Sequence, residues 1–170
     1  MSSPARRRFL TALPALVLLV VTAVLLPAAS KPAAPAAVDS CSLLTKAQIQ
    51  EILGVTVKEK VNTGAVRAAS SACEYMVGDY GVFSLLLTQP VAAGYADTLL
   101  ASFKRNKMKT VDEPGLGDRS FFAMPGYGMT QLNTVGKSSY LLITMLVPGK
   151  TEDQLKPLAV KLMKLALAKL

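Results

Sequence analysis

Short segments with helical and strand-like spacing of hydrophobic residues alternate along the chain from about residue 45 onward. Ile49, Ile52 and Leu53 recur at helical spacing. They follow a Thr45–Gln48 capping-box spacing and precede Gly54, a typical left-handed helix end. We therefore predict a short helix over 46–53. A second amphipathic helix is predicted over about 92–106 from four apolar positions: Tyr95, Leu99, Leu100 and Phe103.

The end of the chain has the pattern of a third, longer helix. Thr151 and Gln154 have capping-box spacing, and two acidic residues lie in the predicted first turn. Pro157 lies far enough inside to kink this helix or delay its regular start. The predicted buried stripe consists of Leu155, Leu158, Leu162, Leu165 and Ala166. Three residues are predicted to lie outside it: Lys161, Lys164 and Lys169.

The remaining apolar segments read as strands separated by glycine-rich turns. They cover about 55–61, 73–77, 82–88, 119–124, 129–135 and 139–147. The stretch 62–71 is polar and is interpreted as a flexible loop, whereas 84–88 is almost continuously apolar and predicts a central strand covered on both faces. Gly136-Lys137 favours a tight hairpin over a phosphate-binding loop. We predict an α+β fold: an antiparallel sheet of about five to six strands with an N-terminal, a middle and a C-terminal helix packed on it.

The first thirty residues have the order of a secretory signal peptide. Three arginines, Arg6 to Arg8, precede an apolar run from Phe9 to Leu26, and small residues follow up to Ser30. We predict cleavage near Ser30, an Ala/Pro spacer over 31–38 and a single domain over 39–170. The apolar run is close to the length that spans a bilayer, so an uncleaved signal anchor is the alternative. In both cases the domain lies outside the cytoplasm. It is periplasmic or secreted if the signal is cleaved, and anchored to the membrane by the N-terminal segment if it is not.

Cysteine content and charge add to this picture. The only two cysteines, Cys41 and Cys73, both belong to the exported portion, which favours one disulfide over a metal pair or a catalytic thiol. The net charge of +8 includes the three N-terminal arginines. From Lys31 onward, 16 basic residues face 11 acidic ones, a balance of +5. Nucleic acid is an unsuitable partner for an exported domain of this modest charge.

The sequence offers no strong catalytic motif. The chain has no histidine, which excludes Ser-His and Cys-His nucleophile pairs, and no cofactor or metal is predicted. An enzyme would need a concave site with convergent polar groups, and the candidate loop for one contains Asp112, Asp118, Arg119 and Tyr127. The simpler interpretation of 111–118 is a turn in which Gly115 and Gly117 adopt unusual φ angles and Asp118 bonds backbone amides.

The densest basic group marks a possible binding surface and consists of Lys104, Arg105, Lys107 and Lys109. Two interpretations are open for it. The group is either a contact for anionic lipid headgroups or an acidic partner, or a solvated helix end stabilised by the helix dipole.

Four landmarks carry a resemblance to a known family. They are Cys41-Ser42-Leu43-Leu44-Thr45, Leu53-Gly54, Cys73-Glu74-Tyr75 and Gly115-Leu116-Gly117-Asp118. In this order the chain resembles exported bacterial cell-envelope domains and lipoproteins of unknown function, over about 39–170. The resemblance implies a Cys41–Cys73 disulfide and an α+β sandwich like that of the Mog1/PsbP group. It lends no catalytic residues, and the lipid-anchoring cysteine of many such relatives is missing here.

Together these features predict a non-enzymatic binding module of the bacterial envelope. Its partner would be an envelope protein or an anionic surface, reached through the sheet face or the loops. The alternative is a carrier of a small apolar ligand or lipid, which the 51% hydrophobic composition suggests.

Overall fold

The computed structural model describes residues 38–67 and 70–170. The described residues belong to one compact unit. The predicted signal segment, and the predicted spacer up to residue 37, lie outside the described residues. Among the helices of the described ranges, none has the length and apolar character needed to cross a bilayer.

The domain is built on one antiparallel sheet of seven strands, rather than the five to six predicted. The strand order is β1-β2-β3-β7-β6-β5-β4, and every neighbouring pair is antiparallel. The strands are β1 (Val57–Arg67), β2 (Ser70–Val77), β3 (Gly81–Thr88), β4 (Lys109–Asp112), β5 (Arg119–Gly126), β6 (Met129–Gly136) and β7 (Ser139–Leu146).

Four helices accompany the sheet instead of three. They are α1 (Ser40–Leu43), α2 (Lys46–Leu53), α3 (Tyr95–Arg105) and α4 (Glu152–Leu167). The predicted capping boxes of α2 and α4 are present, and Gly54 ends α2 in the left-handed conformation. The additional helix α1 is a single turn whose N-cap, Asp39, accepts a hydrogen bond from the Cys41 amide at 3.0 Å.

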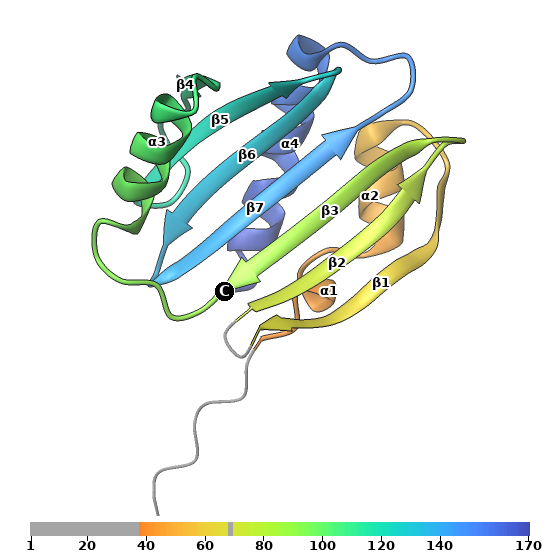
Figure 1. Ribbon diagram of the computed structural model, residues 1–170. Helices are drawn as coiled ribbons and strands as arrows, with labels where there is room; N and C mark the ends of the chain where they lie inside the picture. The colour runs from red at the N-terminus through yellow and green to blue at the C-terminus, as the bar shows by residue number, and fades with distance from the viewer. Residues whose placement is uncertain (1–37, 68–69) are drawn as a thin grey trace, which may run out of the picture. The chain divides into compact units, whose positions relative to one another are not determined.

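The main core lies between one face of the sheet and helices α2 and α4, which lie behind the sheet in Figure 1. Alternate residues of β2, β3, β5, β6 and β7 point into it, as period-two alternation requires. Its largest fully buried side chains include Phe83, Leu85, Leu132, Ile143 and, from α2, Ile49. The described domain therefore has a hydrophobic core of its own.

Helix α3 covers a limited part of the opposite face, at the left of Figure 1. Its rings pack against the sheet in two places: Tyr95 lies 5.1 Å from Tyr140 and Phe103 lies 5.9 Å from Phe121, measured between ring centroids. The Tyr140 hydroxyl donates a hydrogen bond of 2.7 Å to Asn133 Oδ1. Burial raises the pKa of Tyr140 well above its ordinary value, with a smaller contribution from Tyr95, so this hydroxyl stays protonated as the donor.

The central strand β3 is covered on one face rather than both. Phe83, Leu85 and Leu87 are buried, while the residues between them are partly exposed. The prediction of two covered faces is wrong because α3 lies over β4, β5, β6 and the start of β7 and stops short of β3. The partly exposed residues on this side form what we call the open face: Glu74, Met76, Val82, Ser84, Leu86, Leu142, Thr144 and Leu146.

Three further predictions are corrected. The stretch interpreted as a polar loop belongs to strands, because β1 runs to Arg67 and β2 begins at Ser70; residues 68–69 lie outside the described ranges. An antiparallel ladder is made by backbone groups, so a polar sequence does not prevent it.

The buried stripe of α4 also differs from the prediction: Leu165 is 37% exposed, whereas Ala159 and Met163 are fully buried. The helix begins at Glu152 without delay and runs through Pro157.

A disulfide joins Cys41 of α1 to Cys73 of β2, as predicted, with their Cα atoms 5.0 Å apart. Cys73 is buried in the main core, so the bond fixes the start of the domain to the sheet. The closed loop spans a sequence separation of 32. A disulfide is consistent with an oxidising compartment outside the cytoplasm.

Candidate functional site

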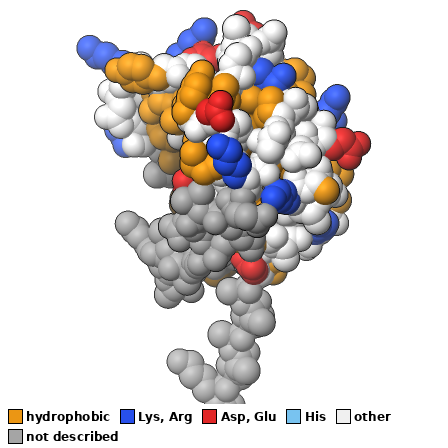
Figure 2. All heavy atoms as spheres, turned by 90° about the vertical axis from the view of Figure 1, so that its right-hand side faces the viewer, with side chains coloured by type: hydrophobic (Ala, Val, Ile, Leu, Met, Phe, Trp, Pro, Cys, Tyr) orange, Lys and Arg blue, Asp and Glu red, His pale blue; other side chains and the backbone are white. Residues whose placement is uncertain are grey.

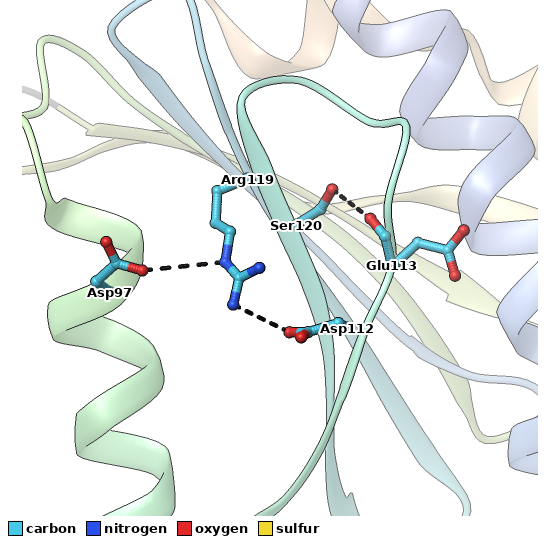
Figure 3. A network of polar contacts seen from close by, with 5 residues as sticks. All are labelled: Asp97, Asp112, Glu113, Arg119 and Ser120. Carbon is cyan, nitrogen blue, oxygen red and sulfur yellow. Dashed lines mark hydrogen bonds and ion pairs between the residues drawn. The ribbon is translucent and has the colours of Figure 1, made fainter.

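Arg119 is the centre of the candidate loop and joins three elements (Figure 3). It begins β5, and its guanidinium lies between carboxylates from α3 and β4. Its Nη2 donates to Asp112 Oδ1 at 3.1 Å, and its Nε lies 3.9 Å from Asp97 Oδ1. The three side chains are 41% to 79% exposed, so this is a solvated surface network.

The loop between β4 and β5, residues 112–120, is held by its own backbone and by one buried side chain; we call it the acidic loop. Leu116 is buried against the main core. The Ser120 hydroxyl donates to the carbonyl oxygen of Leu116 at 2.6 Å and lies 3.0 Å from that of Glu113. Gly117 has φ +57°, and a Cβ there would lie 2.5 Å from the carbonyl oxygen of Val135. The Gly-Leu-Gly-Asp landmark therefore has a packing explanation.

Two shallow clefts flank Arg119. One, of about 440 Å³, is formed by the acidic loop alone. The other, of about 280 Å³, lies between the start of α3, the start of β5 and the end of β6. Asp118 and Arg119 line both clefts. Asp118 does not bond backbone amides through its carboxylate as expected; its own backbone N–H donates to the Val135 carbonyl at 2.7 Å instead.

The chemistry available to this arrangement is limited. Catalysis usually needs a charged group held away from water, and each charged side chain of the Arg119 network faces solvent. The guanidinium is already neutralised by two carboxylates. Within residues 38–67 and 70–170, His, Cys, Asp and Glu nowhere form a group of three able to hold a metal ion. We interpret the Arg119 network as a structural tie between α3, β4 and β5.

Tyr127 is not part of this loop. Strand β5 separates them, with Arg119 at its first residue and Tyr127 directly beyond its last. Tyr127 is 99% exposed and lies in the left-handed region with φ +60°. It shares a two-residue turn with Gly128, which also has positive φ. A tyrosine in this position is uncommon, because its Cβ makes the left-handed conformation costly.

The four predicted basic residues come together between α3 and β4. Lys104 and Arg105 lie in the last turn of α3, and Lys109 begins β4. Lys107 also has a positive φ, of 56°. It occupies the helix-ending position where glycine is usual, since its N–H donates to the Lys104 carbonyl and the next N–H donates to that of Phe103. All four side chains are exposed.

Sequence reasoning missed two features of these sites. Asp97 belongs to the Arg119 network but is 22 positions away in the chain, and only the packing of α3 on β5 brings the two together. The left-handed conformations of Lys107 and Tyr127 are also not visible in the residue types. The turn itself was predicted from the glycines on either side of Tyr127, Gly126 and Gly128.

Comparison of the chain with protein-family models, with curated proteins and with solved structures finds no match. The resemblance based on the four landmarks, and the Mog1/PsbP-like sandwich that it implies, therefore stay predictions.

Proposed function

We propose that this chain is an exported, non-enzymatic binding module of the bacterial envelope, and that its open face contacts an envelope protein. The observation that carries the proposal is the open face itself. It runs across β2, β3 and β7 and carries five partly exposed apolar side chains: Met76, Val82, Leu86, Leu142 and Leu146. The solvated face of an antiparallel sheet is usually polar, so this apolar content favours a partner.

The composition of the open face suits a protein partner. The register places Met76, Val82 and Leu146 in one row and Glu74, Ser84 and Thr144 in the next. Apolar side chains thus alternate with hydrogen-bonding ones, as in interfaces between proteins that also exist apart. Figure 2 looks at the β1 edge of the sheet and not onto the open face; hydrophobic side chains with single charged groups between them lie on the upper part of the described surface in this view.

The carrier alternative has less support. The three clefts described are lined by surface loops and helix ends, at the acidic loop, at the start of α3 and at the end of α2. The space between the sheet and α4 is occupied by Leu, Ile and Met side chains that are almost fully buried.

The test places a photo-crosslinking amino acid at Ser84, in the middle of the open face, and separately at Lys161, on the exposed side of α4. In intact cells we expect a discrete crosslinked protein from Ser84 and none from Lys161. The substitution Leu86→Lys, on the same face, should remove the crosslink without unfolding the domain. Equal crosslinking at both positions, or no crosslink together with turnover of an envelope substrate by the purified protein, would contradict the proposal.

A further inference from the structure

One end of the sheet collects exposed aromatic and basic residues. The turns β2–β3 and β5–β6 both lie at this end, because β2 and β5 finish there and β3 and β6 start there. Each turn presents a tyrosine: Tyr80 is 71% exposed and Tyr127 is 99% exposed. Three strand spacings separate the two turns, which corresponds to about 14 Å.

The four basic residues belong to the same end. Lys109 pairs with Met124, three residues before Tyr127, so the chain from Lys107 to Lys109 approaches the β5–β6 turn. We call the set of Tyr80, Tyr127, Lys104, Arg105, Lys107 and Lys109 the basic–aromatic end.

The acids near this end are paired with lysines outside the group of four, although the charge of Lys109 also acts on Asp153. Of the nearby acids, Asp79 lies 3.7 Å from Lys58 and Asp153 lies 2.8 Å from Lys156. Glu152 lies in the first turn of α4, where a negative charge interacts favourably with the helix dipole. Within the part of the chain that the structure describes, no ion pair involves any of the four basic residues.

Two exposed side chains at this end hold left-handed backbone conformations. Lys107 ends α3, and Tyr127 lies in the β5–β6 turn, both at positions where glycine would be relaxed. The Tyr127 side chain is almost fully exposed, so burial of its ring inside the domain does not offset this cost. Lys137 and Ser138 in the β6–β7 turn have the same backbone geometry, so the exposed aromatic rings, and not the φ angles, distinguish this end.

We propose that the basic–aromatic end docks on the surface of an anionic lipid bilayer. Tyrosine has an apolar ring and a polar hydroxyl, and it partitions to the boundary between water and lipid. Lysine and arginine near an anionic bilayer each strengthen binding by about fivefold. The inference rests on the proposed export of the domain, and it leaves the open face free for a protein partner.

Docking through this end orients the domain. The chain enters at Val38, whose carbonyl accepts a hydrogen bond from Ser71 near the start of β2, at the other end of the sheet. The basic–aromatic end therefore lies at the opposite end of the sheet from Val38.

The experiment uses residues 31–170, which contain the whole described core, and vesicles of phosphatidylcholine with and without phosphatidylglycerol. Co-sedimentation measures the fraction bound. We expect binding only to the anionic vesicles, and its loss as salt rises from about 0.1 M to about 1 M, where the screening length falls from about 10 Å to about 3 Å.

Lysines at two opposite turns give a matched pair of variants. Lys107→Gly and Lys137→Gly each remove one charge from a residue with positive φ, at 56° and 50° respectively, so both should fold at least as well as the parent. Lys137 lies in the β6–β7 turn at the opposite end of the sheet. Lys107→Gly should weaken vesicle binding about fivefold. Tyr127→Gly should weaken it further, whereas Lys137→Gly should leave it near the parent value.

Three results would overturn the proposal: no binding to anionic vesicles at low salt, equal losses for Lys107→Gly and Lys137→Gly, or binding to polyglutamate with none to vesicles. The last would assign this end to an acidic protein instead. Each of these leaves the Ser84 crosslink unaffected, so a failure here is distinguishable from a failure of the proposed module function.

Discussion

The two ends of the sheet handle their charged groups in opposite ways. At the acidic loop, the positive φ of Gly117 is used for a close backbone approach, and Arg119 is paired with two carboxylates. At the basic–aromatic end, the four basic side chains are exposed, and no ion pair among the described residues involves them. The cation at the first end thus has partners inside the domain, whereas the cations at the second end are available to a partner outside it.

This difference separates stability from recognition within one fold. The acidic loop contains the catalytic candidates of the sequence analysis, yet its hydrogen bonds serve to hold the loop in place. The basic group admitted a structural interpretation as a helix end, yet its charges remain available. If the comparison is right, substitutions at the acidic loop should cost stability, and those at the basic–aromatic end should cost binding.

The largest expected effect comes from a change that belongs to neither end. Replacing Cys41 and Cys73 together by alanine removes a cross-link between positions 32 residues apart. It should lower the free energy of unfolding by about 3–4 kcal/mol. Denaturant unfolding measures this. Because both ends share one core, their amides should lose hydrogen-exchange protection together. Loss confined to one end would show that the two ends are separate folding units.

Leu116→Ala should destabilise the domain by about 3 kcal/mol, since it leaves a cavity beneath the acidic loop. The matched control is Leu165→Ala, at a leucine that is 37% exposed, and it should cost much less. Thermal and denaturant unfolding give both values, and vesicle binding below the melting temperature should not change for either variant. Similar costs for the two leucines would mean that the loop is not held by its buried residue.

Tyr127→Gly should have the opposite sign and raise the free energy of unfolding by up to about 1 kcal/mol, because glycine relieves the left-handed conformation. Ser138→Gly, at φ 59° in the opposite turn, should give a similar gain. The comparison predicts that only the first weakens vesicle binding. A destabilised Tyr127→Gly protein would show that the ring makes a contact that the fold needs.

Arg119→Gln should cost less than about 1 kcal/mol, because exposed ion pairs are screened by water and salt. Unfolding measurements at low and high salt should differ more for the parent than for the variant. A cost above about 2 kcal/mol would contradict the description of this network as a solvated tie.

The smallest expected effect reports the positive charge of the basic–aromatic end. A hydrogen bond from Lys156 lowers the pKa of Asp153 below its ordinary 3.8, and the charges of Lys156 and then Lys109 add to this. The stabilising contribution of Asp153 is therefore present above its ordinary pKa and is lost as pH falls through the lowered value. In an NMR titration, Lys156→Met should raise this pKa most and Lys109→Gln slightly. If the pKa of Asp153 is the same in the Lys109→Gln variant as in the parent, Lys109 does not contribute to lowering it.

Capping and turn chemistry made much of the fold predictable. The Thr45–Gln48 and Thr151–Gln154 spacings located two helices closely, and Gly136-Lys137 located a hairpin. What was missed lacked a local signal. Strand β4 has four residues, of which three are exposed, and α1 is a single turn. The exposure of the open face depends on where α3 packs, and the hydrophobic pattern of β3 gives no indication of that position.

The candidate site was less predictable for the same reason. Asp112, Asp118 and Arg119 are close in the chain and close in space, so their grouping needed only a turn. The grouping with Tyr127 was not realised, because a strand carries that residue to the far end of the sheet. The association of Tyr127 with Lys107 and Lys109 depends on the pairing of β4 with β5, and β4 was not predicted.

The most direct test of the comparison is a map of which residues face the bilayer. NMR spectra of the ¹⁵N-labelled domain would be recorded with anionic lipid nanodiscs that carry a gadolinium headgroup. We expect signal broadening to centre on residues 78–81, 104–109 and 126–129, and to spare residues 112–120. Broadening centred on the acidic loop or the open face, or none at all, would contradict the account.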